Sequence, residues 1–460
     1  MRFDKIDNNL YINNRRNYLD KVNQNSTSVF VSNEFMPTNA DETLHFVQNT
    51  NLLYLTGIDQ EETFLILAPN FPDKKMREIL FIKETSEEIS IWEGNKLTKK
   101  EAQEISGIKT VMWNNNFENI LNLILAESNE IYLDKNEHIR SSTKIQTPQD
   151  RFILDIQRRY SSYKIKRSYP ILSDLRMIKN KTEINLIQKA CEITEKGFRR
   201  ILGYVQPDIW EFDIEAEFIH DFIKNRSKGF AYQPIIATGI NACSLHYNEN
   251  KTQCKSGELI LMDVAAEYAN YKSDMTRTIP VNGKFTNRQL EIYNAVLNVK
   301  NEATNILRPG ISINDYHKEV GKIMESELIK IKLIDKVDVK NQDPKNPLFK
   351  KYFMHGTSHH IGLDVHDVGN FYVDLKPGNV FTVEPGIYIR EEKIGVRLED
   401  NILIGDNDNI NLMENIPILN LLPGVKSKLA LGSWFKVFYI ILKDMKFLRG
   451  TPFDFMSWFS

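Results

Sequence analysis

Four of the nine histidines fall within twelve positions of the sequence, in the segment HGTSHHIGLDVHD. They are His355, His359, His360 and His366. A single histidine is more often a structural residue than a ligand, so it is the clustering that carries information. Because imidazole binds divalent ions and titrates near neutrality, this segment predicts a metal site or an acid–base site.

Four acidic residues elsewhere in the chain lie in or at the end of apolar, strand-like runs. A carboxylate in such a run is costly to bury unless its charge is compensated. Each alone is read most simply as an edge-strand or turn residue, but four apolar strands with one acid each call for a common cause. The acids are Asp263 in LILMD, Asp274 in SDMTRT, Glu384 in FTVEPGIYI and Glu399 in GVRLEDNILI. The two-residue period of a strand places Arg397 on the same face as Glu399.

The separation of Asp263 and Asp274 suggests a hairpin. If residues 267 and 270 flank a tight turn, the two carboxylates lie directly opposite each other on paired strands. Tyr268–Ala269 is a poor two-residue turn, so a longer loop with a bulge is equally compatible with the sequence. In the tight hairpin the like charges repel unless a cation lies between them.

The charge balance of these residues favours a dinuclear metal site. Four carboxylates bring four negative charges and a neutral His359 brings none, so two divalent cations cancel the carboxylates and leave room for a bound hydroxide. Two metals about 3.5–4 Å apart make a water nucleophilic at neutral pH and stabilise a developing oxyanion. The residues therefore predict hydrolysis.

This ordered set of residues resembles the creatinase/prolidase/aminopeptidase P superfamily of metal-dependent pita-bread hydrolases. The resemblance covers residues 171–417 closely, and it extends more loosely to residues 46–57, FVQNTNLLYLTG, in the N-terminal part. It implies an α/β (α+β) fold, in which a C-terminal pita-bread domain follows a mixed α/β, creatinase-type N-terminal domain. The two parts together favour an Xaa-Pro aminopeptidase over the single-domain methionine aminopeptidases.

The resemblance also implies metal-binding roles. Asp263 matches a ligand of one metal and Asp274 matches a bridging ligand. His359 and Glu384 match ligands of the other ion, and Glu399 matches a second bridging ligand. Glu384 is in addition a candidate proton shuttle to the leaving nitrogen. The implied cofactors are two divalent ions, with Mn²⁺ expected first and Co²⁺, Zn²⁺ or Fe²⁺ as alternatives.

Further residues match the family's substrate pocket. His246, His355 and His366 match histidines that line it and stabilise the tetrahedral intermediate. Arg397 matches an arginine beside the bridging glutamate, where it would bind a carboxylate of the protein or of the substrate.

Weaker matches suggest that Tyr232 contacts the substrate proline and that Asp41 contacts its amine. His360 has no counterpart in the family and is expected to be a packing residue.

The expected activity is removal of the first residue from peptides with proline in second position. Prolidase, which shares the ligands but requires a free carboxylate on the proline, is the nearest alternative. A non-catalytic peptide-binding homologue is the alternative from another class, and the five filled ligand positions count against it. The resemblance implies a homo-oligomer, a dimer or a tetramer.

Composition excludes several other classes of protein. With 59 Lys+Arg against 61 Asp+Glu the formal net charge is −2, so no basic excess favours nucleic acid. Three cysteines without a Cys-x-x-Cys pair fit a reducing compartment. The first residues lack the apolar block of a secretory signal, and no run approaches the roughly 20 apolar residues that span a membrane. We therefore expect a cytoplasmic protein that does not enter a membrane.

The pattern of short apolar runs and amphipathic stretches predicts the elements. Strands are expected at residues 27–31, 63–68, 79–82 and 131–133, and helices at 149–160, 182–200 and 213–226, with a proline-marked turn at Tyr169–Pro170. The expected domains are an N-terminal domain at 1–168, a catalytic domain at 169–417 and an atypical tail at 418–460.

The sequence departs from the family at three places. The FVQNTNLLYLTG motif has Val47, Asn49 and Asn51 where the family usually carries an arginine and acids. The segment between Glu384 and Glu399 is shorter than in some bacterial relatives. Residues 418–460 hold six Lys+Arg and two acids, which suggests a foreign tail or an amphipathic helix that packs on a partner subunit.

Overall fold

The computed structural model describes residues 2–141 and 143–418 of the 460-residue chain. Residues Met1–Pro417 form one compact unit. The predicted tail, apart from its first residue, lies outside the described residues. Within the described part, no helix combines the length and apolar character needed to cross a membrane.

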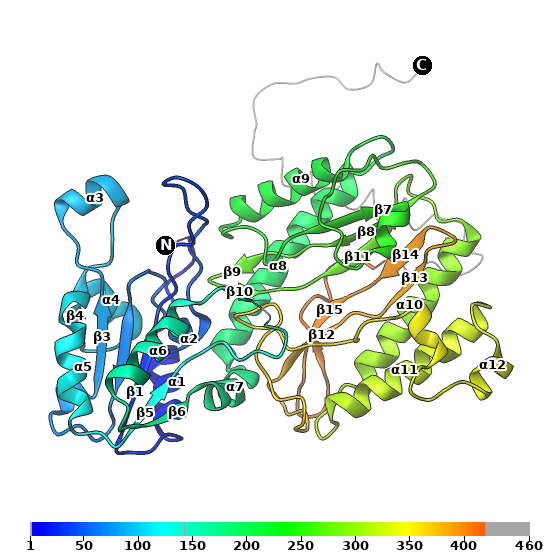
Figure 1. Cartoon of the computed structure of the whole chain (residues 1–460). Helices are drawn as coiled ribbons and strands as arrows, with labels where there is room; N and C mark the ends of the chain where they lie inside the picture. Colours follow the sequence, from blue (N-terminus) through cyan, green and yellow to red (C-terminus); the bar gives the residue numbers. More distant parts are fainter. Residues whose placement is uncertain (1, 142, 419–460) are drawn as a thin grey trace, which may run out of the picture. The chain divides into compact units, whose positions relative to one another are not determined.

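The N-terminal part is a six-stranded mixed sheet in the order β4-β3-β2-β1-β5-β6 (Figure 1). The strands are β1 (Ser26–Val31), β2 (Phe64–Leu67), β3 (Glu78–Ile82), β4 (Thr110–Trp113), β5 (Glu130–Leu133) and β6 (Lys164–Arg167). The four predicted strands are confirmed. The two edge strands, β4 and β6, were missed; β6 reads KIKR, in which charged residues obscure the apolar pattern.

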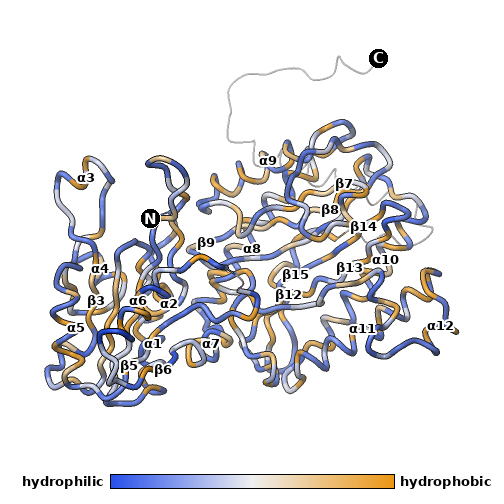
Figure 2. Tube along the Cα trace, viewed as in Figure 1, coloured by the Kyte–Doolittle hydropathy of each residue, from blue (hydrophilic) through white to orange (hydrophobic). Residues whose placement is uncertain are grey.

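The helices of this part are α1 (Asn9–Leu19), α2 (Thr50–Thr56), α3 (Glu87–Glu93), α4 (Lys99–Ser106), α5 (Phe117–Leu125) and α6 (Pro148–Arg159). All of them except α3 contribute buried side chains. Phe117 of α5 stacks on Phe64 of β2 at 4.3 Å between ring centroids, and Ile156 of α6 lies in the same buried cluster. Apolar and polar residues alternate along α4, α5 and α6 (Figure 2), as amphipathic helices on a sheet require.

The first half of the C-terminal part begins with α7 (Tyr169–Met177), α8 (Lys181–Tyr204) and α9 (Glu211–Lys224). The predicted turn at Pro170 is wrong, because proline occupies the first turn of α7, where its missing N–H costs nothing. Asn180 caps α8 and forms a capping box with Glu183. The strands that follow are β7 (Ile235–Thr238), β8 (Leu259–Asp263), β9 (Glu267–Tyr268), β10 (Tyr271–Lys272) and β11 (Thr276–Pro280).

The second half contains α10 (Asn287–Ile306), α11 (Ile313–Lys330), α12 (Lys336–Lys340) and five strands. The strands are β12 (Val380–Val383), β13 (Gly386–Ile389), β14 (Ile394–Arg397), β15 (Asp400–Leu403) and β16 (Ile410–Asn411). The two apolar runs expected to be single strands are each broken in two, at Glu384–Pro385 and at Leu398–Glu399. Proline cannot donate to the ladder, so it ends β12 and turns the chain into β13.

The strands of the two halves meet between helices. α8 packs on β9 and β10 and α9 on β7, whereas α10 packs on β12, β13 and β14. β14 contacts both β8 and β11, which joins the two halves (Figure 1). This is the mixed α/β arrangement of the pita-bread fold expected from the sequence.

A buried ion network fixes the junction of the two halves. Asp400 of β15 is fully buried and accepts from Arg277 of β11 at 2.6 Å; it also pairs with Lys300 of α10. Arg277 in addition donates to the carbonyl oxygen of Glu399 at 2.5 Å. The network therefore holds the backbone next to one of the predicted metal ligands.

Replacing Asp400 with alanine should leave two buried cations without their carboxylate. We expect the free energy of unfolding to fall by about 3–5 kcal/mol, measured by urea denaturation of the metal-free protein. The exposed Asp406, changed to alanine in the same way, should leave the free energy unchanged. Equal effects of the two substitutions would show that the network does not stabilise the fold.

Candidate metal centre

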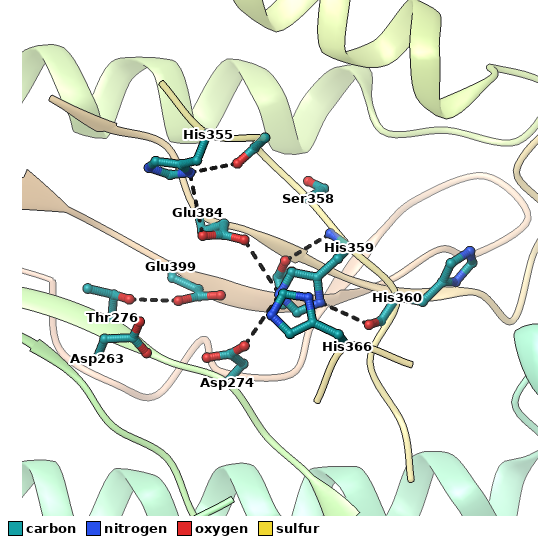
Figure 3. Close-up of polar contacts among 12 residues, drawn as sticks. Asp263, Asp274, Thr276, His355, Ser358, His359, His360, His366, Glu384 and Glu399 are labelled. Carbon is teal, nitrogen blue, oxygen red and sulfur yellow. Dashed lines mark hydrogen bonds and ion pairs between the residues drawn. The ribbon is translucent and has the colours of Figure 1, made fainter. Parts of the chain in front are cut away.

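The five predicted metal ligands converge in space although they come from distant parts of the chain (Figure 3). Asp263 is the last residue of β8, and Asp274 lies between β10 and β11. Glu384 and Glu399 occupy the two strand breaks, and His359 lies on the segment before β12. Each carboxylate thus lies at the end of a strand or between two strands, and all four line a common cavity of about 580 Å³.

The predicted register of the Asp263–Asp274 hairpin is wrong by one position on each strand. The turn residues are Ala269 and Asn270, both with positive φ, so Tyr268 pairs with Tyr271 and Asp263 pairs with Thr276. Left-handed residues at both central positions match the twist of a two-residue hairpin, and asparagine tolerates them well. Asp274 is therefore diagonal to Asp263.

His359 lies between two of the acids. Its Nε2 is 3.5 Å from Asp274 Oδ2 and 3.5 Å from Glu384 Oε1, while its Nδ1 bonds to the carbonyl oxygen of His360 at 2.9 Å. The Nδ1 contact assigns the proton to Nδ1 and leaves Nε2 as an electron-pair donor. One ligand atom each of Asp274, His359 and Glu399 lies within 4.8 Å of the others.

The site makes the charged form of three carboxylates less stable, so that their pKa values are raised. Burial, and then the charge of Asp263, raises the pKa of Asp274 well above its usual range. Burial and Glu399 raise the pKa of Glu384, and burial, Asp274 and Asp263 raise that of Glu399. The protein alone does not supply enough positive charge for this group.

The residues fit divalent cations. Glu399 Oε2 accepts from Thr276 at 2.6 Å, but Oε1 is buried with no partner within the described chain. An orphaned buried carboxylate oxygen is costly unless a ligand occupies it. Two donors about 2.1 Å from one ion are about 3.0–3.4 Å apart, close to the His359 contacts, and a set of oxygens with one imidazole suits divalent metals.

Arg397 links Asp263 to a chain of hydrogen bonds. Its guanidinium donates to Asp263 Oδ2 at 2.6 Å, to Tyr388 Oη at 2.8 Å and to Thr276 Oγ1 at 3.1 Å. Tyr232 donates to the other oxygen of Asp263 at 2.6 Å. Burial lowers the pKa of Arg397, but Tyr388, Asp263 and Glu384 outweigh it and raise the pKa well above its usual range. The predicted neighbours Arg397 and Tyr232 are thus both part of the site.

The three predicted pocket histidines line the same cavity in different ways. His355 is occupied on both ring nitrogens, by the Gly356 carbonyl and by Tyr388 Oη, each at 2.8 Å. His366 stacks on His359 with ring centroids 4.1 Å apart, and Arg140 donates to its Nδ1 at 2.5 Å. Burial, then His359 and Arg140, lowers the pKa of His366 to about 2, and burial and Arg397 lower that of His355 to about 3. His246 has no hydrogen-bond partner among the residues that the structure describes.

Two predicted residues lie outside the cavity. His360 is buried against Phe381, 4.1 Å between centroids, and a Cβ on Gly369 would come within 2.1 Å of its ring. This geometry is that of the packing residue expected from the sequence. Asp41 is exposed and lines neither this cavity nor the adjoining one, so this chain alone does not bring it to the site.

A second cavity of about 860 Å³ adjoins the first, and Arg140, His246, Val365 and His366 line both. Its wall includes Asp134, whose pKa burial raises to about 6. Asn49 and Asn51 donate hydrogen bonds to this carboxylate at 3.2 and 2.8 Å. These two atypical residues of the FVQNTNLLYLTG motif thus bind Asp134.

The same wall includes Lys272, whose pKa is lowered by burial. The second cavity therefore carries charged groups of both signs.

Sequence reasoning missed several residues of the site. Tyr388 could have been found from the two-residue period of GIYI, which places it near Arg397 across β13 and β14. Arg140 lies in a loop without any local signal. Asn401, which bonds the backbone of Asp274 at 3.1 and 2.8 Å, is hidden in an apolar run.

A buried carboxylate after His366 was also missed. Asp367 pairs with Arg176 at 2.6 Å and with Lys179 at 2.9 Å, and its backbone N–H bonds to the His360 carbonyl at 2.9 Å. This contact closes the loop that carries both His359 and His366. Nothing in the sequence connects residue 367 with helix α7.

Comparisons with known proteins agree with this geometry. Residues 185–406 match the metallopeptidase family M24, and residues 11–132 match the aminopeptidase P N-terminal domain. The Xaa-Pro aminopeptidase of Escherichia coli is 31% identical over 415 residues, which are 87% of this chain and 93% of that protein. That of Haemophilus influenzae is 33% identical and covers 86% of this chain and 92% of its own length.

Solved structures show the same fold. Zinc-substituted E. coli aminopeptidase P in complex with product has a TM-score of 0.81 and 29% identity, with 90% of this chain and 97% of that chain covered. The fold and the carboxylate–histidine site thus define a metal-dependent peptidase. The chain belongs to metallopeptidase family M24, within its Xaa-Pro aminopeptidase group.

The raised pKa values predict how the stability of the metal-free protein depends on pH. The pKa of an acidic side chain is near 4 in the unfolded chain, and the folded state raises it for Asp274, Glu384 and Glu399. At pH values between the unfolded and the folded pKa, the folded state therefore binds more protons than the unfolded chain. The free energy of unfolding of the metal-free protein should therefore fall as pH rises above about 4. Excess divalent metal, which replaces these protons, should remove the decline.

Urea denaturation at several pH values, with and without metal, tests this. Asp367, whose pKa the paired cations lower to about 2 against the effect of burial, loses its contribution only as pH falls from about 4, so it does not interfere. Parallel pH profiles with and without metal would contradict the prediction.

Proposed function

We propose that this chain is a dinuclear Xaa-Pro aminopeptidase that removes the first residue from peptides with proline in second position. The observation that carries the proposal is the convergence of four acids and His359 on a cavity that continues into a second one. The names of the relatives support the substrate class, since the similar E. coli and H. influenzae proteins are Xaa-Pro aminopeptidases.

The proposed ligands are Asp263, Asp274, His359, Glu384 and Glu399. Their oxygen-rich composition favours Mn²⁺, and Co²⁺, Zn²⁺ and Fe²⁺ are alternatives. Bound divalent ions supply a water of lowered pKa and positive charge for the scissile carbonyl.

Glu384 is proposed to move the proton that frees the proline. The nitrogen of an Xaa-Pro bond carries no hydrogen, so it must gain one to leave as a secondary amine. Glu384 combines a raised pKa with an oxygen, Oε2, that lies 3.8 Å from His355 and accepts no hydrogen bond within the described chain. This oxygen can hold a proton and deliver it to the departing nitrogen.

The histidines and Arg397 are proposed to position the substrate. The bond from Arg140 to Nδ1 of His366 leaves the hydrogen on Nε2, so this neutral ring can donate to a substrate carbonyl. His246 faces the same cavity with both ring nitrogens available. Arg397 and Tyr232 hold Asp263 from both sides, which fixes the orientation of this proposed ligand.

The adjoining cavity favours an aminopeptidase over a prolidase. A dipeptide would end at its proline, whereas a longer peptide needs room beyond it. The second cavity starts at His246 and His366 and provides that room. Tyr232 remains the proposed contact to the proline ring, and Asp41 a proposed contact to the amine.

We also propose the domains, assembly and compartment expected from the sequence. Residues 1–168 and 169–417 would form an N-terminal and a catalytic domain, with 418–460 as an atypical tail. Ile91 and Trp92 on α3 expose most of their apolar surface, which offers a second copy a contact for the expected dimer or tetramer. The even charge balance and free cysteines support a cytoplasmic location.

The proposal predicts the substrate range directly. Metal-stripped protein should be inactive, and added Mn²⁺ should restore release of the first residue from Ala-Pro-Ala. Ala-Ala-Ala should be cleaved far more slowly, because the pocket is expected to select proline. Chromatography of the products over time provides the measurement.

Other outcomes distinguish the alternatives. Cleavage confined to the dipeptide Ala-Pro would identify a prolidase. Bound metal without turnover of any of these peptides would favour a non-catalytic binding protein.

A further inference from the structure

Lys272 in the second cavity lies on the same side of its strand as Asp274, a proposed metal ligand. Beyond β10 the ladder continues, since Ser273 N bonds to Ala266 O and Val264 N to Met275 O. Alternate residues of such a ladder face the same side, so Lys272 and Asp274 project together. The intervening Ser273 points the other way and bonds to Thr194 of α8. Lys272 lines the second cavity, and Asp274 lines the first.

The ammonium of Lys272 has no hydrogen-bond or ion-pair partner in residues 2–141 and 143–418. Two acids in its surroundings are already engaged. Asp364 Oδ2 accepts from Arg176 at 2.8 Å and from Thr50 at 2.9 Å. Glu267, opposite Lys272 in the hairpin, accepts from the backbone N–H groups of Lys228 and Asn270. A partly buried cation with no dedicated partner favours an incoming anion.

The charges around the cavity also favour an anion. Of the cations that line it, Arg176 is matched by Asp364, which also lines it. Arg140 and Lys272 remain, against Asp134 as the one further acid among the described lining residues. The first cavity, by contrast, is rich in carboxylates and suits cations. A peptide bound across both would place its negative groups on the side of Lys272.

The spacing indicates which part of a peptide Lys272 would meet. Residues 272 and 274 are about 6.6 Å apart along the strand, and their side chains stand roughly perpendicular to it. An extended peptide advances about 3.4 Å per residue, so about 6.6 Å spans two residues from the scissile bond, which reaches the first residue after the proline, and the flexible lysine side chain extends this reach to the second.

We propose that Lys272 determines specificity by binding a carboxylate of the substrate at the first or second residue after the proline. This carboxylate is either an acidic side chain or the C-terminal group of a short peptide. The inference rests on the proposed function, because it assumes that the peptide runs from the first cavity into the second.

Paired substrates test the preference and separate the two sources of charge. Peptides of the form Ala-Pro-X-Ala-amide and Ala-Pro-Ala-X-amide, with X as Glu or Gln, report on a side chain. Ala-Pro-Ala as free acid or amide reports on the C-terminus. The native enzyme should favour the acidic member of at least one pair by about tenfold in kcat/KM, mainly through a lower KM.

Variants assign the preference to Lys272. Lys272→Met should abolish it while kcat on the neutral peptides stays unchanged, and Lys272→Arg should retain it. Lys228→Met is the matched control, because Lys228 is a nearby cation that pairs with Asp59 and does not line the cavity. This control should keep the native preference.

Binding of the products provides a readout that does not depend on turnover. Calorimetry with the corresponding peptides that begin at the proline should show tighter binding of the acidic member to native protein and equal binding to Lys272→Met. Equal affinities for native protein, or a preference that survives in Lys272→Met, would overturn the inference. If the neutral peptides are still cleaved when the Lys272 inference fails, the proposed aminopeptidase function stands without it.

Discussion

The mutual repulsion of four carboxylates around His359 is the constraint on which the site depends. Burial and neighbouring charge raise the pKa of Asp274, Glu384 and Glu399, and one oxygen of Glu399 has no partner within the described residues. A fold that gathers such groups loses stability unless cations or protons compensate them. The arrangement is therefore suited to bind positive charge, and bound cations would stabilise the oxyanion that forms when an amide is hydrolysed.

The protein holds these groups in place with a second set of acids that are fully paired. Asp400 follows Glu399 and is bound by Arg277 and Lys300, while Asp367 follows His366 and is bound by Arg176 and Lys179. Burial raises the pKa of these two acids, but the paired cations lower it by more. The two residues of each neighbouring pair thus have different roles: the paired acid fixes the backbone, and the residue before it faces the cavity.

The sequence predicted which acids gather at the site better than it predicted their geometry. Residue type and apolar context identified Asp263, Asp274, Glu384 and Glu399, because a charge in a buried run has few explanations. The sequence did not reveal the strand breaks at Glu384 and Glu399 or the Ala269–Asn270 turn, because their positions depend on which strand register packs best. Long-range partners such as Arg140, Tyr388 and Asp367 were hidden because their contacts join segments that only the tertiary fold brings together.

The most direct test of the account is the number of metal ions that the chain binds. Metal-free protein dialysed against Mn²⁺ at neutral pH should retain two ions per chain by atomic emission, and Asp274→Ala should lose most of this binding while the fold is kept. Retention of two ions by the native chain and their loss from Asp274→Ala would show that the buried carboxylates bind the cations. Protein that retains no Mn²⁺ or other divalent ion, or binding that Asp274→Ala leaves unchanged, would contradict the account.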